Sequence, residues 1–107
     1  MKDYFNDQIK RLEADRDYCV RALLAVSEAT YINKDEILSS SRKDPISKAR
    51  FMLYNLMSRH GFDDAEIGRI IDRHASTISY GIEQHKELMH ENDDYATKYT
   101  NALNKIR

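Results

Sequence analysis

The 107-residue chain has few residues of the kinds that interrupt or cross-link a fold: three glycines, one proline and one cysteine. Scarce Gly and Pro favour helices with short connections and argue against a linker or a disordered chain. The single Cys19 cannot form an internal disulfide, which indicates a reducing compartment. No apolar run approaches the roughly 18 residues that a membrane-spanning helix needs, and the first 17 residues are too charged for a secretion signal. We therefore expect one cytoplasmic, all-α protein without a membrane segment.

The charged residues nearly cancel, but they are unevenly distributed. Asp and Glu number 18 against 17 Lys and Arg, a net charge of −1. Basic residues prevail from Arg42 to Arg59, where they are Arg42, Lys43, Lys48, Arg50 and Arg59. Acidic residues prevail from Glu83 to Asp94, where they are Glu83, Glu87, Glu91, Asp93 and Asp94. The sequence therefore predicts a basic patch and a separate acidic patch.

Apolar residues recur at spacings of three and four, which is the period of an amphipathic helix. The expected helices span residues 3–29, 35–40, 45–60, 64–71, 75–90 and 94–106. Polar residues precede three of them as capping signals: Asn33 with Glu36, Asp44 before Pro45, and Asp63 with Glu66. We expect no strands, so the predicted fold is all-α with about six helices.

The segment EIGRIIDRHASTISYGI, residues 66–82, predicts two helices joined by a short polar turn. In a helix-turn-helix the second helix lies in the major groove of DNA with its N-terminal residues against the bases. Ile78 and Ile82 would hold this helix to the protein. The side chains left facing outward are Arg73, His74, Ser76, Thr77 and Tyr80. They offer the donors, acceptors and methyl group that base edges require, although two packed helices with a Ser-Thr cap also occur in ordinary helical domains.

Three short motifs follow one another along the chain: AR at residues 49–50, EIG at 66–68 and R-x-x-S-T-I from Arg73. With them, residues 18–107 resemble the C-terminal DNA-binding domain of DnaA, the bacterial replication initiator. The resemblance implies a Trp-repressor-like helix-turn-helix domain that binds double-stranded DNA in replication initiation or transcription control. By position it implies phosphate contacts for Arg42, Lys43 and Lys48, a minor-groove contact for Arg50, and major-groove contacts for Arg73, Ser76 and Thr77.

Two departures from the family pattern are informative. His74-Ala75 stands where the family signature has Asp-His, so we expect a different target sequence. The chain has no GxxxxGK[ST] motif, so we expect no bound nucleotide and no ATPase activity. The pattern is that of a stand-alone domain such as a phage or mobile element carries.

The sequence gives little support to functions other than DNA binding. The spacings of the four histidines do not predict a metal site, and no catalytic arrangement is recognisable, so we expect no enzyme and no cofactor. The rival hypothesis is a DnaA-like module that binds a replication or host protein instead of DNA. Residues 1–17 lie outside the resemblance, and two readings stay open for them: a coiled-coil homodimer, or folding back on the core.

Overall fold

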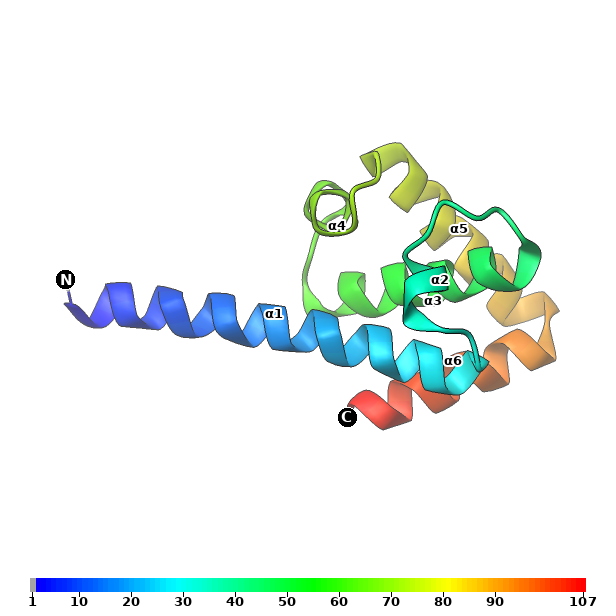
Figure 1. Cartoon of the computed structure of the whole chain (residues 1–107), viewed down its shortest axis with the longest axis horizontal. Helices are drawn as coiled ribbons and strands as arrows, with labels where there is room; N and C mark the ends of the chain where they lie inside the picture. Colours follow the sequence, from blue (N-terminus) through cyan, green and yellow to red (C-terminus); the bar gives the residue numbers. More distant parts are fainter. Residues whose placement is uncertain (1) are drawn as a thin grey trace.

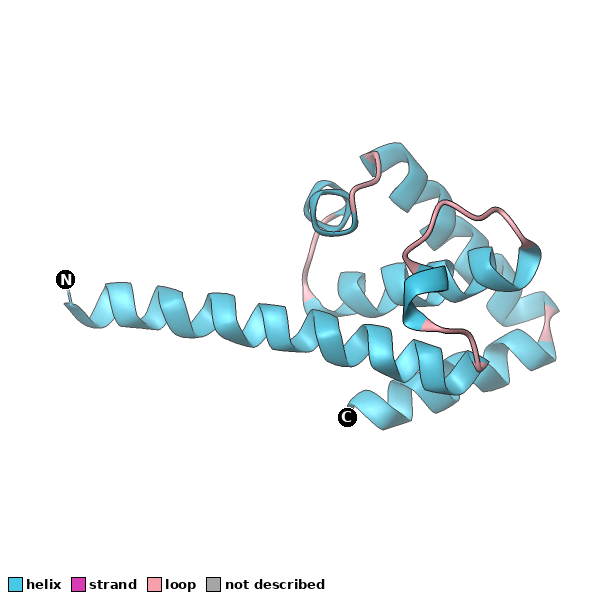
Figure 2. Cartoon of the chain, in the orientation of Figure 1, coloured by secondary structure: helices cyan, strands magenta, loops and turns pink. Residues whose placement is uncertain are grey.

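The computed structural model describes residues 2–107, and these form six helices without a strand (Figures 1 and 2). The helices are α1 (Lys2–Thr30), α2 (Lys34–Ile37), α3 (Asp44–His60), α4 (Asp64–Ile71), α5 (Ala75–Glu91) and α6 (Asp93–Ile106). The predicted all-α class is confirmed, and most predicted ends agree within two residues. The largest difference is α2, which ends three residues earlier than expected.

Helix α3 lies at the centre of the fold and contacts each of the other five helices. Its apolar residues Ile46, Ala49, Leu53, Leu56 and Met57 recur at helical spacing, and all five are buried. The second half of α1 covers one side of α3, and α6 runs back alongside α1 (Figure 1). Apolar side chains from every helix meet around α3, so the two functional candidates, the loop before α3 and the α4–α5 pair, rest on one core.

The first half of α1 continues the helix beyond the domain instead of folding back on the core (Figure 1). The folded-back alternative for residues 1–17 is therefore wrong for the described residues 2–17. The exit point is held by Tyr18, whose ring stacks on His60 at 3.9 Å and whose hydroxyl donates to the Leu56 carbonyl at 2.8 Å. Asp15 Oδ1 lies 3.0 Å from His60 Nε2, so α1 leaves the domain at about residue 15.

The helix caps predicted from the sequence are only partly present in the structure. Asp63 and Glu66 form the predicted capping box, with Asp63 Oδ1 accepting from the Glu66 N–H at 2.8 Å. Asn33 does cap α2, but it accepts from the N–H of Asp35, and the box with Glu36 is wrong.

The expected cap at Asp44 is also wrong. Lys43 occupies the N-cap position of α3, and Asp44 is already helical. One position further in, the Asp44 carboxylate faces the next turn and pairs with Lys48 at 3.0 Å. A carboxylate in the first turn still interacts favourably with the helix dipole.

The buried imidazole of His85 should make stability depend on pH. His85 is 5% exposed, its Nδ1 lies 2.6 Å from the Tyr95 hydroxyl, and burial, with a smaller effect of Arg59, lowers its pKa from 6.5 to about 4. At a pH between these two pKa values, His85 is protonated in the unfolded chain and neutral in the folded chain. We expect the free energy of unfolding to fall by up to about 3 kcal/mol as pH drops from about 7 to 4. Urea titrations at a series of pH values would measure it.

The control is His85→Gln, which keeps a polar side chain but cannot titrate. Its stability should fall less steeply over the same pH range, and the carboxylates account for what remains. Identical slopes in both proteins would show that His85 is not the titrating group.

Candidate nucleic-acid interface

Helices α4 and α5 pack against each other and are joined by a turn of three residues, 72–74. Two residues make so sharp a turn feasible. Asp72 adopts a left-handed backbone conformation, with φ of 57°, which Asp tolerates better than most residues. Gly68 has no side chain at the point where the Arg73 carbonyl oxygen touches α4, and a Cβ there would overlap that oxygen. The turn is closed by the Arg73 N–H, which donates to the Gly68 carbonyl at 2.8 Å.

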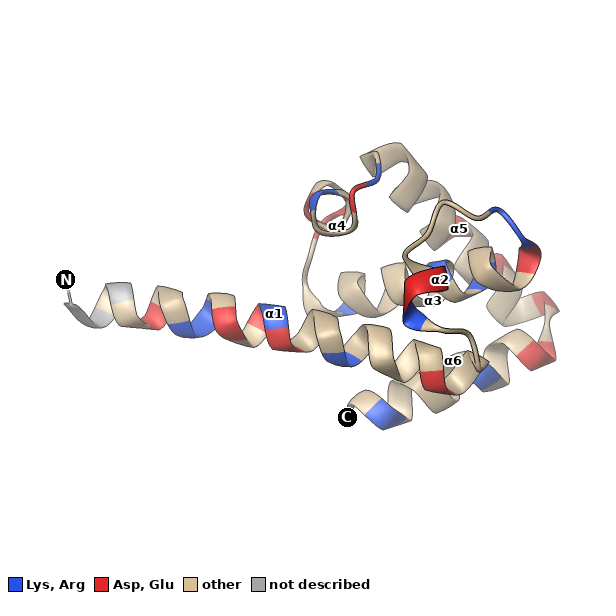
Figure 3. Ribbon diagram, viewed as in Figure 1, with Lys and Arg blue, Asp and Glu red and all other residues tan. Residues whose placement is uncertain are grey.

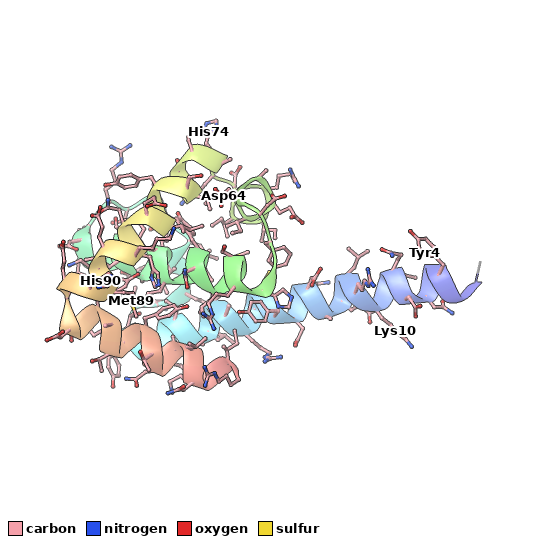
Figure 4. The ribbon with its side chains drawn as sticks, turned by 180° about the vertical axis from the view of Figure 1, so that it is seen from behind. Tyr4, Lys10, Asp64, His74, Met89 and His90 are labelled. Carbon is pink, nitrogen blue, oxygen red and sulfur yellow. The ribbon has the colours of Figure 1, made fainter. Side chains whose placement is uncertain are left out.

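The orientation of α5 on α4 is set by one apolar and one polar contact. Ile78 is completely buried, and on the next residue the Ser79 hydroxyl donates to the Asp64 carboxylate. The first turn of α5 therefore faces solvent. The side chains of His74, Ser76 and Thr77 are exposed there, and His74 lies at the end of α5 farthest from α1 (Figure 4).

Two arginines hold the loop between α2 and α3 in place. Arg50, on α3, is 8% exposed and donates to the carbonyls of Ser39 and Ser41. Arg73, in the turn before α5, donates to the same Ser39 carbonyl at 2.7 Å and to that of Leu38 at 3.2 Å. One carbonyl thus accepts from both guanidinium groups, which joins the loop, α3 and the turn into a single unit.

Burial lowers the pKa of Arg50, and the neighbouring charge of Arg73 lowers it further. A guanidinium has so high an ordinary value that it stays charged at neutral pH. Both groups therefore contribute positive charge to the surface next to the loop.

That surface is a groove of about 610 Å³ between the loop, α3 and the start of α5. It is lined by Ser40, Ser41, Arg42, Ser47, Arg50, Phe51, Tyr54, Arg73, Thr77 and Tyr80. Three guanidinium groups and several hydroxyls line it, and no carboxylate does. Tyr80 stands at its edge, 60% exposed, with its ring edge-on to Phe51 at 6.3 Å. Such a lining favours an anion with oxygen acceptors, such as a phosphate.

The groove brings together five of the nine predicted site residues: Arg42, Arg50, Arg73, Thr77 and Tyr80. Lys43 follows in the same loop, and His74 and Ser76 lie on the adjoining first turn of α5; all three are exposed. Lys48 does not join them. It pairs with Asp44 and lines a different pocket with Asn92 and Tyr95. Lys48 is on a different face of α3 from Ser47 and Arg50, which line the groove.

The other five groove residues were not predicted from the sequence: Ser40, Ser41, Ser47, Phe51 and Tyr54. For Ser47 a signal was present, because residues three and four apart share a helix face. Ser47 is three residues before Arg50 and four before Phe51. For Ser40 and Ser41 there was none, since their position depends on the two arginines that hold the loop.

Charges of both signs are spread over the molecule. Figure 3 shows basic residues in the loop before α3, with an acidic segment directly after them at the start of α3, and acidic residues around the junction of α5 and α6. Within the described chain no cluster of His, Cys, Asp and Glu could hold a metal ion, and no helix there is both long and apolar enough to cross a bilayer.

The chain was compared with protein-family models, with curated proteins and with solved structures, and none of the three comparisons finds a match.

Proposed function

We propose that this protein binds duplex DNA, with α4 and α5 acting as a helix-turn-helix and α5 as the recognition helix. The observation that carries the proposal is the groove with three guanidinium groups and no carboxylate, directly beside the exposed polar first turn of α5. Phosphate contacts supply much of the affinity of DNA-binding proteins, and side chains on the first turn of a recognition helix supply the sequence reading.

The exposed residues divide into two roles. Arg42 and Lys43, at the end of the loop, would bind phosphates. His74, Ser76 and Thr77, on the first turn of α5, would meet base edges in the major groove. Tyr80 follows one turn later at the edge of the groove, where its hydroxyl could reach a phosphate or a base.

Arg50 and Arg73 receive a different role from the one that the resemblance implies. Their guanidinium groups are occupied by backbone carbonyls of the loop and the turn. We assign them as positioning residues that hold Arg42 and Lys43 beside α5 and add positive charge to the groove. Lys48 lies outside this surface and receives no role.

The resemblance to the DnaA DNA-binding domain supports a role in replication initiation or transcription control. It rests on the AR motif of α3, on the EIG segment of α4 and on the R-x-x-S-T-I segment at the start of α5. The first and the last of these supply residues that line the groove. The changed pair His74-Ala75 falls at the N-cap and first residue of α5, which supports a target sequence different from that of the family.

The test is selection of bound duplexes from a random library, followed by affinity measurements at several salt concentrations. We expect a selected sequence and a logarithm of affinity that falls linearly with the logarithm of salt concentration, by about 0.9 for each phosphate contact. Failure to bind any duplex at low salt would overturn the proposal.

A protein-interaction module is the second candidate. The net charge of −1 and the acidic residues at the α5–α6 junction favour it, because they repel DNA from that side of the molecule. The same selection separates the two candidates, since a module without DNA binding would retain no duplex.

A further inference from the structure

The projecting half of α1 carries apolar side chains that nothing in the described chain covers. Ile9 is 40% and Leu12 68% exposed, and they lie three residues apart on one face of the helix. An isolated helical segment of this length is marginally stable in water. A partner that buries this face would stabilise it.

The same face of α1 leads into an apolar groove of about 300 Å³ on the domain. The groove is lined by Cys19, Val20, Leu23, Leu38, Leu53, Met57, Ile70, Ile71 and Asp72. Three of its side chains are unusually exposed for their type: Val20 at 51%, Leu38 at 42% and Ile70 at 48%. Neighbouring exposed apolar side chains of this kind mark interaction sites.

We propose that the occupant is a second copy of this chain, paired antiparallel along α1. Ile9 and Val20 are 11 residues apart, which is just over three turns of helix, so they share a helix face. In a two-fold pair centred between residues 14 and 15, Ile9 of each copy faces Val20 of the other. Each copy supplies one projecting segment and one groove, so the contact is self-complementary and closes at two subunits.

The charges near the centre of this pair select the antiparallel arrangement. Arg16 and Glu13 are exposed, and neither forms an ion pair within the described residues. Arg16 and Glu13 are equally distant from the centre of the pair, between residues 14 and 15, as Ile9 and Val20 are. The same register therefore places Arg16 of each copy beside Glu13 of the other. A parallel pair in register would instead place the two Arg16 side chains together, where like charges repel.

The oligomeric state of the protein without DNA tests the pairing separately from DNA binding. Sedimentation equilibrium should give twice the chain mass of 12.6 kDa. Leu12→Glu should raise the dissociation constant of the dimer by about 100-fold or more, because each copy places a charge in the apolar contact. Ala14→Glu is the matched control. It adds the same charge two residues away, at an exposed position on the opposite face, and should leave the dimer intact.

Circular dichroism should show that both variants keep their helices. A wild-type protein that is monomeric up to its solubility limit would overturn the proposal. Equal dimerisation of the Leu12→Glu variant would overturn it as well.

Disulfide trapping tests the direction and the register. With Cys19→Ser removing the native thiol, the double variant Ile9→Cys/Val20→Cys should form a covalent dimer on mild oxidation. Ile9→Cys alone should not, because the two copies of position 9 would lie about 16 Å apart along the helix axis. Ready cross-linking of the single variant would indicate a parallel pair and overturn the arrangement.

Discussion

Reversing the charges at Arg42 and Lys43 together should weaken duplex binding by about 100- to 1,000-fold at low salt. The double variant Arg42→Glu/Lys43→Glu changes the charge beside the groove by four units, each worth close to 1 kcal/mol at short range in water. Both side chains are exposed, so the fold should be unaffected. Fluorescence anisotropy with a labelled duplex would measure the affinity, and the log–log salt slope should fall by about two units.

The matched control is Lys10→Glu/Arg11→Glu on the projecting half of α1. These are also adjacent, exposed basic residues, and their reversal changes the net charge by the same amount. Figure 4 shows Lys10 on the projecting helix, away from the domain that carries His74, so this control should reduce affinity only slightly. Equal losses in the two double variants would show that only net charge matters and that the loop is not the binding surface.

Replacing Gly68 with alanine should destabilise the protein by about 1–3 kcal/mol, the usual cost of overpacking a filled site. The added methyl group would overlap the Arg73 carbonyl oxygen, and backbone cannot move aside as a flexible side chain can. The turn and α4 would have to separate, which also lengthens the hydrogen bond from the Arg73 N–H to the Gly68 carbonyl. Urea unfolding would measure the stability.

The sign of this effect is diagnostic. Gly68 lies inside a helix, where alanine is intrinsically better than glycine by about 1 kcal/mol. Without the overlap, Gly68→Ala would therefore stabilise the protein. Ala65→Gly, at an exposed position of the same helix, should cost only this intrinsic amount and serves as the reference. A more stable Gly68→Ala variant would mean that the turn is looser than described.

Several features of the fold could be predicted because they depend on local physics. The apolar spacing that identified the buried face of α3 involves residues within a few turns of one another. The capping box of Asp63 and Glu66 spans four residues, and the turn of residues 72–74 lies directly between two apolar segments. The same reasoning failed at Asp44, where a shift of one residue exchanges a cap for an ion pair with Lys48.

Which residues meet at the candidate interface was decided by tertiary contacts. Arg42 and Thr77 line one groove although 35 positions separate them. Arg50 and Arg73 come together at the Ser39 carbonyl, and no local pattern distinguishes these two loop-holding guanidinium groups from the exposed one of Arg42.

By itself, the sequence determined the helical class, most of the helix ends and the tight turn before α5, because caps and apolar spacing act over one or two turns. Only the tertiary structure decided that Arg50 and Arg73 hold the loop instead of facing solvent, that Lys48 lies outside the groove and that the first half of α1 projects. Those outcomes depend on which backbone carbonyls need donors and on which faces the core leaves uncovered, and both are properties of packed helices rather than of any one segment.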